Sequence, residues 1–145
     1  MTSHHTPPSG HTLVELVLVM LVMTLAALMG IRQFQLLMDR LATRDAVRAA
    51  SSVIARARDE ALALHTAVSV RIDTAASALE LRSRDGPIAT VPLRSMHGVT
   101  LSTTRDSITF DVRGLGYGTA NLTLVARRGR SADTLVVSRL GRARD

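Results

Sequence analysis

Cysteine is absent from this 145-residue sequence, and so are lysine and tryptophan. The absence of cysteine excludes disulfides, zinc-thiolate sites and thiol catalysis. The aromatic residues are Phe34, Phe110 and Tyr117, so any hydrophobic core must be aliphatic. A globular domain of roughly 80 residues with such a core is only marginally stable alone, and packing against a helix or neighbouring subunits would stabilise it.

The positive charge is carried by arginine alone, with 18 basic residues and a net charge of +6. Most of the excess positive charge lies between Arg127 and Asp145, a segment that contains six arginines and two aspartates. Such an asymmetry favours anionic partners, which include lipid headgroups, acidic proteins and nucleic acid.

The sequence contains no convergent set of reactive side chains. No pair among its five histidines has the spacing of metal ligands. Gly114, Gly116 and Gly118 lack the strand-then-helix context of a dinucleotide-binding loop and indicate a turn-rich connection. We therefore expect neither an enzyme nor a bound metal or cofactor.

Residues 16–31 are aliphatic except for Thr24 and Gly30, and with the residues from His11 onward they are long enough to span a bilayer. A secretory signal peptide is disfavoured because residues 1–10 contain no lysine or arginine. A plain transmembrane anchor explains the length but not Glu15, since burying a carboxylate in lipid costs about 2–3 kcal/mol or more.

The segment Ser9-Gly10, followed by His11 and the residues up to Leu16, resembles the class III signal of type IV prepilins. This resemblance implies that a prepilin peptidase cleaves between Gly10 and His11 and that the new N-terminus of His11 is methylated. It also implies that Glu15, the fifth mature residue, pairs with the N-terminus of a neighbouring subunit. An ammonium and a carboxylate that meet in an apolar polymer neutralise each other, so the pair fixes register. The sequence departs from the family pattern at His11, where phenylalanine is usual.

A single helix is predicted from about Thr12 to about Leu64, roughly 80 Å long at 1.5 Å per residue. No proline or glycine occurs between Arg32 and Gly86. Apolar residues recur at steps of three and four. They are Ile31, Phe34, Met38, Leu41, Ala46, Ala50, Val53, Ala57, Ala61 and Leu64. We expect the first half of this helix in lipid and the second half against the head.

Four arginines of this helix, Arg40, Arg44, Arg48 and Arg56, share one face. One interpretation is a solvated face relieved by neighbouring acidic residues. The other is contact with lipid phosphates near the membrane exit or with an adjacent subunit. The acidic residues available for the first interpretation are Asp39, Asp45, Asp59 and Glu60.

The period changes to two after Leu64, which predicts a β-rich head. Residues 68–72 and 79–82 suggest a hairpin, and Asp85-Gly86-Pro87 a turn before the apolar residues 88–91. Further strands are predicted at 99–102, 108–112, 120–126 and 134–138, with connections at 114–118 and 127–130. The fold class is therefore α+β, a long N-terminal helix packed on a small antiparallel β-sheet head. We divide the chain into a leader (1–10), a transmembrane part (11–31), an amphipathic continuation (32–64) and the head with its basic tail (65–145).

Three further segments are similar to the GspH/FimT family of minor pseudopilins. They are Ala57-Arg58-Asp59-Glu60-Ala61 with Val68 opening a strand, Ile108-Thr109-Phe110-Asp111 followed by Gly114, and Val136 to Arg144. The resemblance covers nearly the whole chain and implies a pilin-like fold. It also implies a subunit of a type II secretion pseudopilus or a type IV pilus, single-pass in the bacterial inner membrane, with its head in the periplasm or at the filament surface. The implied partners are other pilins, the prepilin peptidase, the inner-membrane assembly platform and membrane lipid.

The C-terminal segment Gly141-Arg142-Ala143-Arg144 is the candidate binding site. Arginines two apart in an extended segment point to one side and can grip successive phosphates. In FimT-type minor pilins a tail of this form is associated with DNA capture, so DNA is the alternative partner. Arg127, Arg128 and Arg130 would extend the surface if their hairpin lies nearby. The competing interpretation is structural, with these arginines paired to carboxylates such as Asp133.

Overall fold

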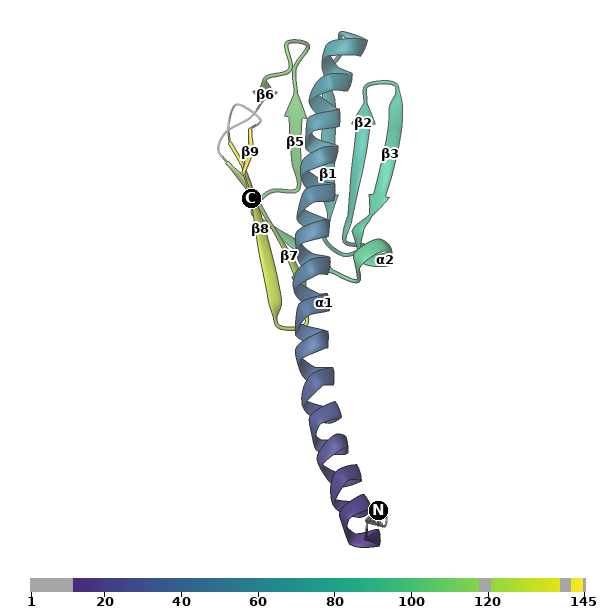
Figure 1. The fold of residues 1–145 in the computed structure, drawn as a ribbon. Helices are drawn as coiled ribbons and strands as arrows, with labels where there is room; N and C mark the ends of the chain where they lie inside the picture. The colour runs from purple at the N-terminus through teal and green to yellow at the C-terminus, as the bar shows by residue number, and fades with distance from the viewer. Residues whose placement is uncertain (1–11, 118–120, 139–141, 145) are drawn as a thin grey trace, which may run out of the picture. The chain divides into compact units, whose positions relative to one another are not determined.

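The computed structural model describes residues 12–117, 121–138 and 142–144. The described chain divides into two compact units between Gln35 and Leu36. One long helix, α1 (Leu13–Leu64), contributes to both units (Figure 1). The predicted helix bounds, Thr12 and Leu64, are confirmed to within one residue.

The first unit contains the apolar half of α1. This half is long and apolar enough to cross a membrane, and none of its most apolar stretch is buried within the chain. The side chain of Leu13 is 80% exposed, and that of Met29 is 74% exposed. The hydroxyl of Thr24 donates to the carbonyl oxygen of Met20 at 2.7 Å, which satisfies the one polar side chain between Leu16 and Gly30.

In the second unit, α1 buries one face made mostly of small side chains. The buried residues are Ala42, Thr43, Ala46, Val47, Ala50, Val53, Ile54, Ala57 and Ala61. The predicted stripe is confirmed from Ala46 to Ala61. It is wrong at Met38, Leu41 and Leu64, which are exposed because the buried face of α1 begins at Ala42 and ends at Ala61.

The head contains two antiparallel sheets, where the sequence predicted one. The first has five strands in the order β3-β2-β1-β5-β6 and the second four in the order β4-β7-β8-β9. The strands of the first sheet are β1 (Val68–Asp73), β2 (Ala78–Ser83), β3 (Gly86–Pro92), β5 (Ser107–Phe110) and β6 (Gly116–Tyr117). Those of the second are β4 (Thr100–Thr103), β7 (Leu122–Arg128), β8 (Ser131–Val137) and β9 (Ala143–Arg144).

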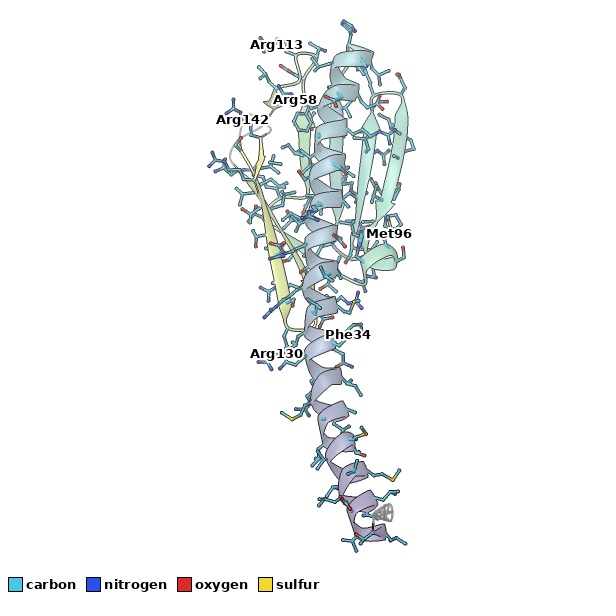
Figure 2. All side chains as sticks on the ribbon, in the orientation of Figure 1. Phe34, Arg58, Met96, Arg113, Arg130 and Arg142 are labelled. Atoms are coloured by element: carbon cyan, nitrogen blue, oxygen red, sulfur yellow. The ribbon has the colours of Figure 1, made fainter. Side chains whose placement is uncertain are left out.

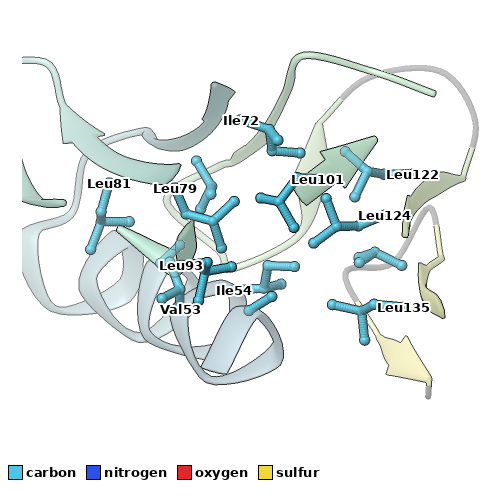
Figure 3. Packing of buried hydrophobic residues seen from close by; sticks show 14 of the residues in the cluster. Val53, Ile54, Ile72, Leu79, Leu81, Leu93, Leu101, Leu122, Leu124 and Leu135 are labelled. Carbon is cyan, nitrogen blue, oxygen red and sulfur yellow. The ribbon is translucent and has the colours of Figure 1, made fainter. Parts of the chain in front are cut away.

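Both sheets and the second half of α1 share one aliphatic core. Val53 and Ile54 of the helix pack in one cluster with leucines from both sheets (Figure 3). Those leucines include Leu79 and Leu81 of β2 and Leu101, Leu122, Leu124 and Leu135 of the second sheet. Phe110 is fully buried in the same cluster. The predicted packing of a β-rich head on the helix is therefore confirmed.

Several local predictions about the head need correction. Gly86 and Pro87 belong to β3, and the turn is formed by Arg84 and Asp85. Proline is accepted there because β3 is an edge strand. The sequence also gave no sign of a short helix, α2 (Leu93–His97). Residues 116–117 and 127–128, predicted as connections, lie in β6 and β7.

Ser77 links the two sheets. It is fully buried in the turn between β1 and β2. Its hydroxyl oxygen accepts hydrogen bonds from the Leu101 N–H in β4 at 3.2 Å and from the Arg94 guanidinium of α2 at 3.2 Å. This bridge links the second sheet, and with it the arginines of β7 and β9, to the first.

Candidate functional site

The predicted assembly residue Glu15 lies in the first turn of α1. The Glu15 N–H donates to the Thr12 side-chain oxygen at 3.3 Å, so Thr12 caps the helix. A threonine at the N-cap with a glutamate three residues later is the spacing of a capping box. The sequence contained this signal, which gives Glu15 a local structural context besides its predicted pairing. Gly10 and His11, the predicted processing residues, lie outside the described residues.

The C-terminal arginines lie beside the helix. Ala143 in β9 pairs with Val137 and packs partly buried against the core, whereas Arg142 and Arg144 remain exposed. The segment is fixed by two hydrogen bonds, from the Ser138 N–H to the Arg142 carbonyl oxygen at 2.8 Å and from the Arg142 N–H to the Ser138 hydroxyl at 3.1 Å. Gly141 lies outside the described residues.

Arg142 and Arg144 line a groove of about 540 Å³, which we call the tail groove. Its other wall is α1, which contributes Arg58 and Asp59 among its lining residues. The two tail arginines therefore open onto one side, as the sequence predicted. Arg58 adds a third guanidinium that sequence spacing could not reveal, because it comes from a distant segment.

Arg127, Arg128 and Arg130 do not extend the tail groove. In the β7–β8 ladder Arg128 pairs with Ser131 next to the turn, while Leu122 pairs with Val137 at the other end. A seven-residue strand separates the two ends by about 20 Å. Figure 2 shows Arg130 and Arg142 at opposite ends of this strand pair. The condition that the hairpin lies near the tail is therefore not met.

Arg128 fastens the tip of the β7–β8 hairpin to the rest of the head. Its guanidinium forms an ion pair with Asp39 of α1 at 3.2 Å and donates to the His97 carbonyl oxygen at 2.7 Å. Gly129 follows with a φ of 54°, and a Cβ there would collide with the Asp39 carboxylate. The left-handed backbone favours glycine here, and a larger residue would displace the Asp39 carboxylate from its place beside the hairpin.

The hairpin tip and the helix enclose a second basic groove of about 630 Å³, which we call the hairpin groove. Its lining residues are Leu36, Arg40, Thr43, Arg44, Arg130, Ser131, Ala132 and Asp133. The arginine stripe of α1 is thereby divided. Arg48 and Arg56 form surface ion pairs within the helix, with Asp45 at 3.8 Å and with Glu60 at 3.4 Å. Arg40 and Arg44 open onto the groove.

Asp111 organises the loop between β5 and β6. Its Oδ1 accepts hydrogen bonds from the N–H groups of Leu115 and Arg113, each at 2.9 Å. The hydrogen bond from Leu115 is the largest cause of a lowered Asp111 pKa, and those from Arg113 add to it against partial desolvation. Gly114 has a φ of 69°, and a Cβ there would lie 3.1 Å from side-chain carbons of Arg58 and Leu62. The loop is thus held closely against the end of α1.

Comparison with known proteins identifies the fold. No protein-family model and no curated protein matches the sequence. Among solved structures, the type IV minor pilin FimU of Pseudomonas aeruginosa in space group P21 is similar, with a TM-score of 0.61 and 18% identity over 72% of this chain and 88% of that chain. Its P65 crystal form has a TM-score of 0.56 and 17% identity over 70% of this chain and 90% of that chain.

A protein from a secretion system has the same fold. The minor pseudopilin EpsH from the Type 2 Secretion System of Vibrio cholerae has a TM-score of 0.56 and 15% identity, over 70% of this chain and 94% of that chain. The expected fold is therefore confirmed: the chain has the fold of a GspH/FimT-like minor pseudopilin. These neighbours are described as pilin subunits, and none is described as an enzyme.

Proposed function

We propose that this chain is a minor pseudopilin, a structural subunit of a type II secretion pseudopilus or a type IV pilus. The observation that carries the proposal is the fully exposed apolar half of α1, joined to a head with the fold of minor pilins. Apolar side chains over this length require lipid or the interior of a filament. The subunit is held in the bacterial inner membrane by this one helix, with its head in the periplasm, until the assembly platform incorporates it.

Processing by prepilin peptidase between Gly10 and His11 is part of the proposal, and so is methylation of the His11 amine. Its support is the leader sequence that ends at Gly10, because cleavage there makes Glu15 the fifth residue of the mature chain. Mass spectrometry of the protein extracted from membranes is expected to give a chain that begins at His11 with one added methyl group. A mature start near Gly30, or an intact leader in cells with active peptidase, would contradict the processing step.

The role of Glu15 in assembly can be separated from its role in the helix cap. Glu15→Gln removes the charge and retains the hydrogen-bonding capacity that suits a capping box, whereas Glu15→Ala removes both. If the charge pairs with a neighbouring N-terminus, crosslinking to partner pilins falls to the same low level in both variants. The stability of the head is expected to remain unchanged in each, since Glu15 belongs to the other compact unit.

Thr12→Val is the matched control, because it removes the capping hydroxyl and retains the carboxylate. We expect it to crosslink as the wild type does. Normal crosslinking of Glu15→Gln, together with loss in Glu15→Ala and Thr12→Val, would assign Glu15 to the cap instead. Loss of crosslinking in all four conditions, wild type included, would contradict the subunit proposal itself.

DNA binding is the second candidate function, favoured by the tail groove. Arg58, Arg142 and Arg144 line it with one carboxylate, Asp59, and its lining contains no aromatic side chain among the described residues. Guanidinium groups grip phosphates, while base stacking needs aromatic rings. Binding would therefore be independent of sequence, with a dissociation constant on the order of 10⁻⁴ to 10⁻⁶ M. Several subunits in one filament would strengthen it through avidity.

The test is titration of the full chain in nonionic detergent micelles with unrelated duplexes at two salt concentrations. Removing two phosphate contacts with Arg142→Gln and Arg144→Gln should weaken every duplex alike and reduce the salt slope by about 1.8. The matched control is Arg127→Gln with Arg130→Gln, which removes the same charge from the other end of the hairpin. Equal weakening by both pairs would indicate binding through overall charge and not through the tail groove.

A further inference from the structure

We propose that the hairpin groove binds the phosphate of an anionic phospholipid headgroup and thereby holds the head at a defined depth on the membrane before assembly. The inference rests on the proposed membrane anchoring and adds a ligand and a site to it. The site comprises Arg40 and Arg44 of α1 and Arg130 at the hairpin tip.

The charges around the groove leave its arginines available. Among the described residues Arg40, Arg44 and Arg130 form no ion pair, and Asp133 is the one carboxylate in the lining. Asp133 Oδ1 accepts a hydrogen bond from the Thr134 N–H at 2.9 Å. The groove therefore has an excess of positive charge and guanidinium groups whose fork geometry suits phosphate oxygens.

Asp39, the nearest acidic residue in sequence to Arg40, is already engaged. It pairs with Arg128 at 3.2 Å, at the point where Gly129 brings the hairpin backbone against its carboxylate. This contact has a second consequence, because it fastens the tip that carries Arg130 against α1. The three guanidinium groups are thus brought together by a fixed tertiary contact, which lowers the entropy lost when a ligand binds.

The position along the helix indicates lipid as the source of the phosphate. Exposed large apolar side chains follow one another along α1 as far as Leu41, and the next ones lie at the other end of the helix, at Leu62 and Leu64. Arg40 and Arg44 come within one turn of Leu41 in the sequence, close to the point where the apolar stretch that the proposal places in the membrane ends. Side chains on a helix lean toward its N-terminus, so Arg40 and Arg44 lean toward the headgroup layer.

The size and lining of the groove favour a headgroup over a free ion. The groove has a volume of about 630 Å³ and includes the apolar side chain of Leu36 beside the arginines. Inorganic phosphate would leave most of that space filled with water and would make no use of Leu36. A phospholipid headgroup offers both the anionic phosphate and the apolar glycerol and acyl-chain carbons next to it.

Lipid retention by the full chain tests the proposal. The protein in dodecyl maltoside micelles is given equal amounts of phosphatidylglycerol and phosphatidylcholine, and the lipids that stay bound are counted by native mass spectrometry. The groove variant combines three substitutions, Arg40→Gln, Arg44→Gln and Arg130→Gln. The matched control removes three exposed arginines from the first sheet and its β2–β3 turn, Arg71→Gln, Arg82→Gln and Arg84→Gln.

We expect the wild type and the control to retain phosphatidylglycerol in preference to phosphatidylcholine. The groove variant should lose at least tenfold in this preference, since each arginine near an anionic surface contributes roughly a fivefold change in affinity. A second variant with lysine at the same three positions retains the charge and should restore part of the preference. Equal retention by the groove variant and the control would overturn the proposal.

Two further measurements remove the remaining ambiguities. Inorganic phosphate is added to the same micelles at millimolar concentration, and displacement of bound phosphatidylglycerol would overturn the assignment to lipid in favour of a free anion. Alkaline extraction of cell membranes reports insertion for every variant. Wild-type protein that extracts as a soluble chain would contradict the membrane anchoring, whereas a membrane-bound chain without lipid preference would contradict the groove alone.

Discussion

The two halves of α1 place apolar side chains in opposite surroundings. In the first half the large aliphatic residues are exposed, and the exposed fraction of Leu13 is 80%. In the second half the buried residues are mostly alanines, and Ala57 and Ala61 have no exposed surface. The largest apolar side chains therefore face outward and the smallest face inward, the reverse of what water would select.

The difference shows which neighbour each half is built for. Small side chains let the helix backbone approach the sheets closely, so that Val53 and Ile54 reach the leucines of both sheets. Large aliphatic side chains with nothing around them in the chain need an apolar solvent, either acyl chains or other subunits. In the sequence, high mean hydropathy indicates the first half of α1. Small side chains recurring with the helical period indicate the second half.

Arginine substitution in each half gives the largest expected effects. Leu21→Arg places a charge at the centre of the apolar half and should oppose membrane insertion by about 3 kcal/mol, with no change in head stability. Ala57→Arg buries an unpaired charge and should destabilise the head by more than about 3 kcal/mol, with insertion unchanged. Alkaline extraction measures the first quantity and urea unfolding of the protein in micelles the second. An effect of either variant on the other quantity would break the comparison.

The parts of the fold that the sequence predicted are those governed by local periodicity. The helix stripe from Ala46 to Ala61 and the hairpin of β1 and β2 follow from periods of 3.6 and 2. The two-residue strands β6 and β9 are too short to show a period, and they exist because a longer neighbouring strand provides hydrogen-bonding partners.

Of the two candidate sites, one could be predicted from local sequence and the other depends on a tertiary contact. Arg142 and Arg144 are neighbours in the sequence, so their common side could be predicted from an extended backbone. Arg130 meets Arg40 and Arg44 only because Arg128 fastens the hairpin to Asp39, a contact between residues far apart in the chain. A periodic pattern cannot reveal such a contact, because it depends on how the second sheet packs against the helix.

Two glycines sharpen the comparison with effects of opposite sign. Gly114→Ala forces a side chain into a position with a φ of 69° and within 3.1 Å of Arg58 and Leu62, so the head should lose about 1–2 kcal/mol of stability. Gly30→Ala lies in the exposed half, where an added Cβ would meet nothing within 4 Å. Alanine should there stabilise the helix by about 0.8–1 kcal/mol. Urea unfolding reports the first change and helix content from circular dichroism in micelles the second.

The two glycine predictions would be contradicted if both substitutions changed stability in the same direction. Destabilisation of the isolated subunit by Gly30→Ala would mean that the apolar half has a neighbour within the chain that requires glycine. An unchanged head in Gly114→Ala would mean that the β5–β6 loop is not held against α1. Either outcome would weaken the assignment of a protein neighbour to one half and an external apolar neighbour to the other.

Acid provides the smallest and most selective probe, because it acts on the loop at the end of the second half. The pKa of Asp111 is lowered chiefly by the hydrogen bond from the Leu115 N–H, and secondarily by hydrogen bonds and charge from Arg113. The unfolded chain keeps the ordinary carboxyl pKa, so it binds more protons than the folded chain over the window between the two values. The contribution of Asp111 to stability is therefore fully present above about pH 4 and is lost as the pH falls through the lowered folded value.

Asp111→Asn retains an acceptor oxygen without the charge and should flatten the fall in urea midpoint below pH 4. Asp85→Asn, at an exposed turn of the first sheet, is the control and should leave that fall as in the wild type. The helix content of the apolar half should not change over this pH range in either variant. An equal pH dependence in Asp111→Asn and the wild type would show that the loop is held by packing against Leu62 and not by the Asp111 carboxylate.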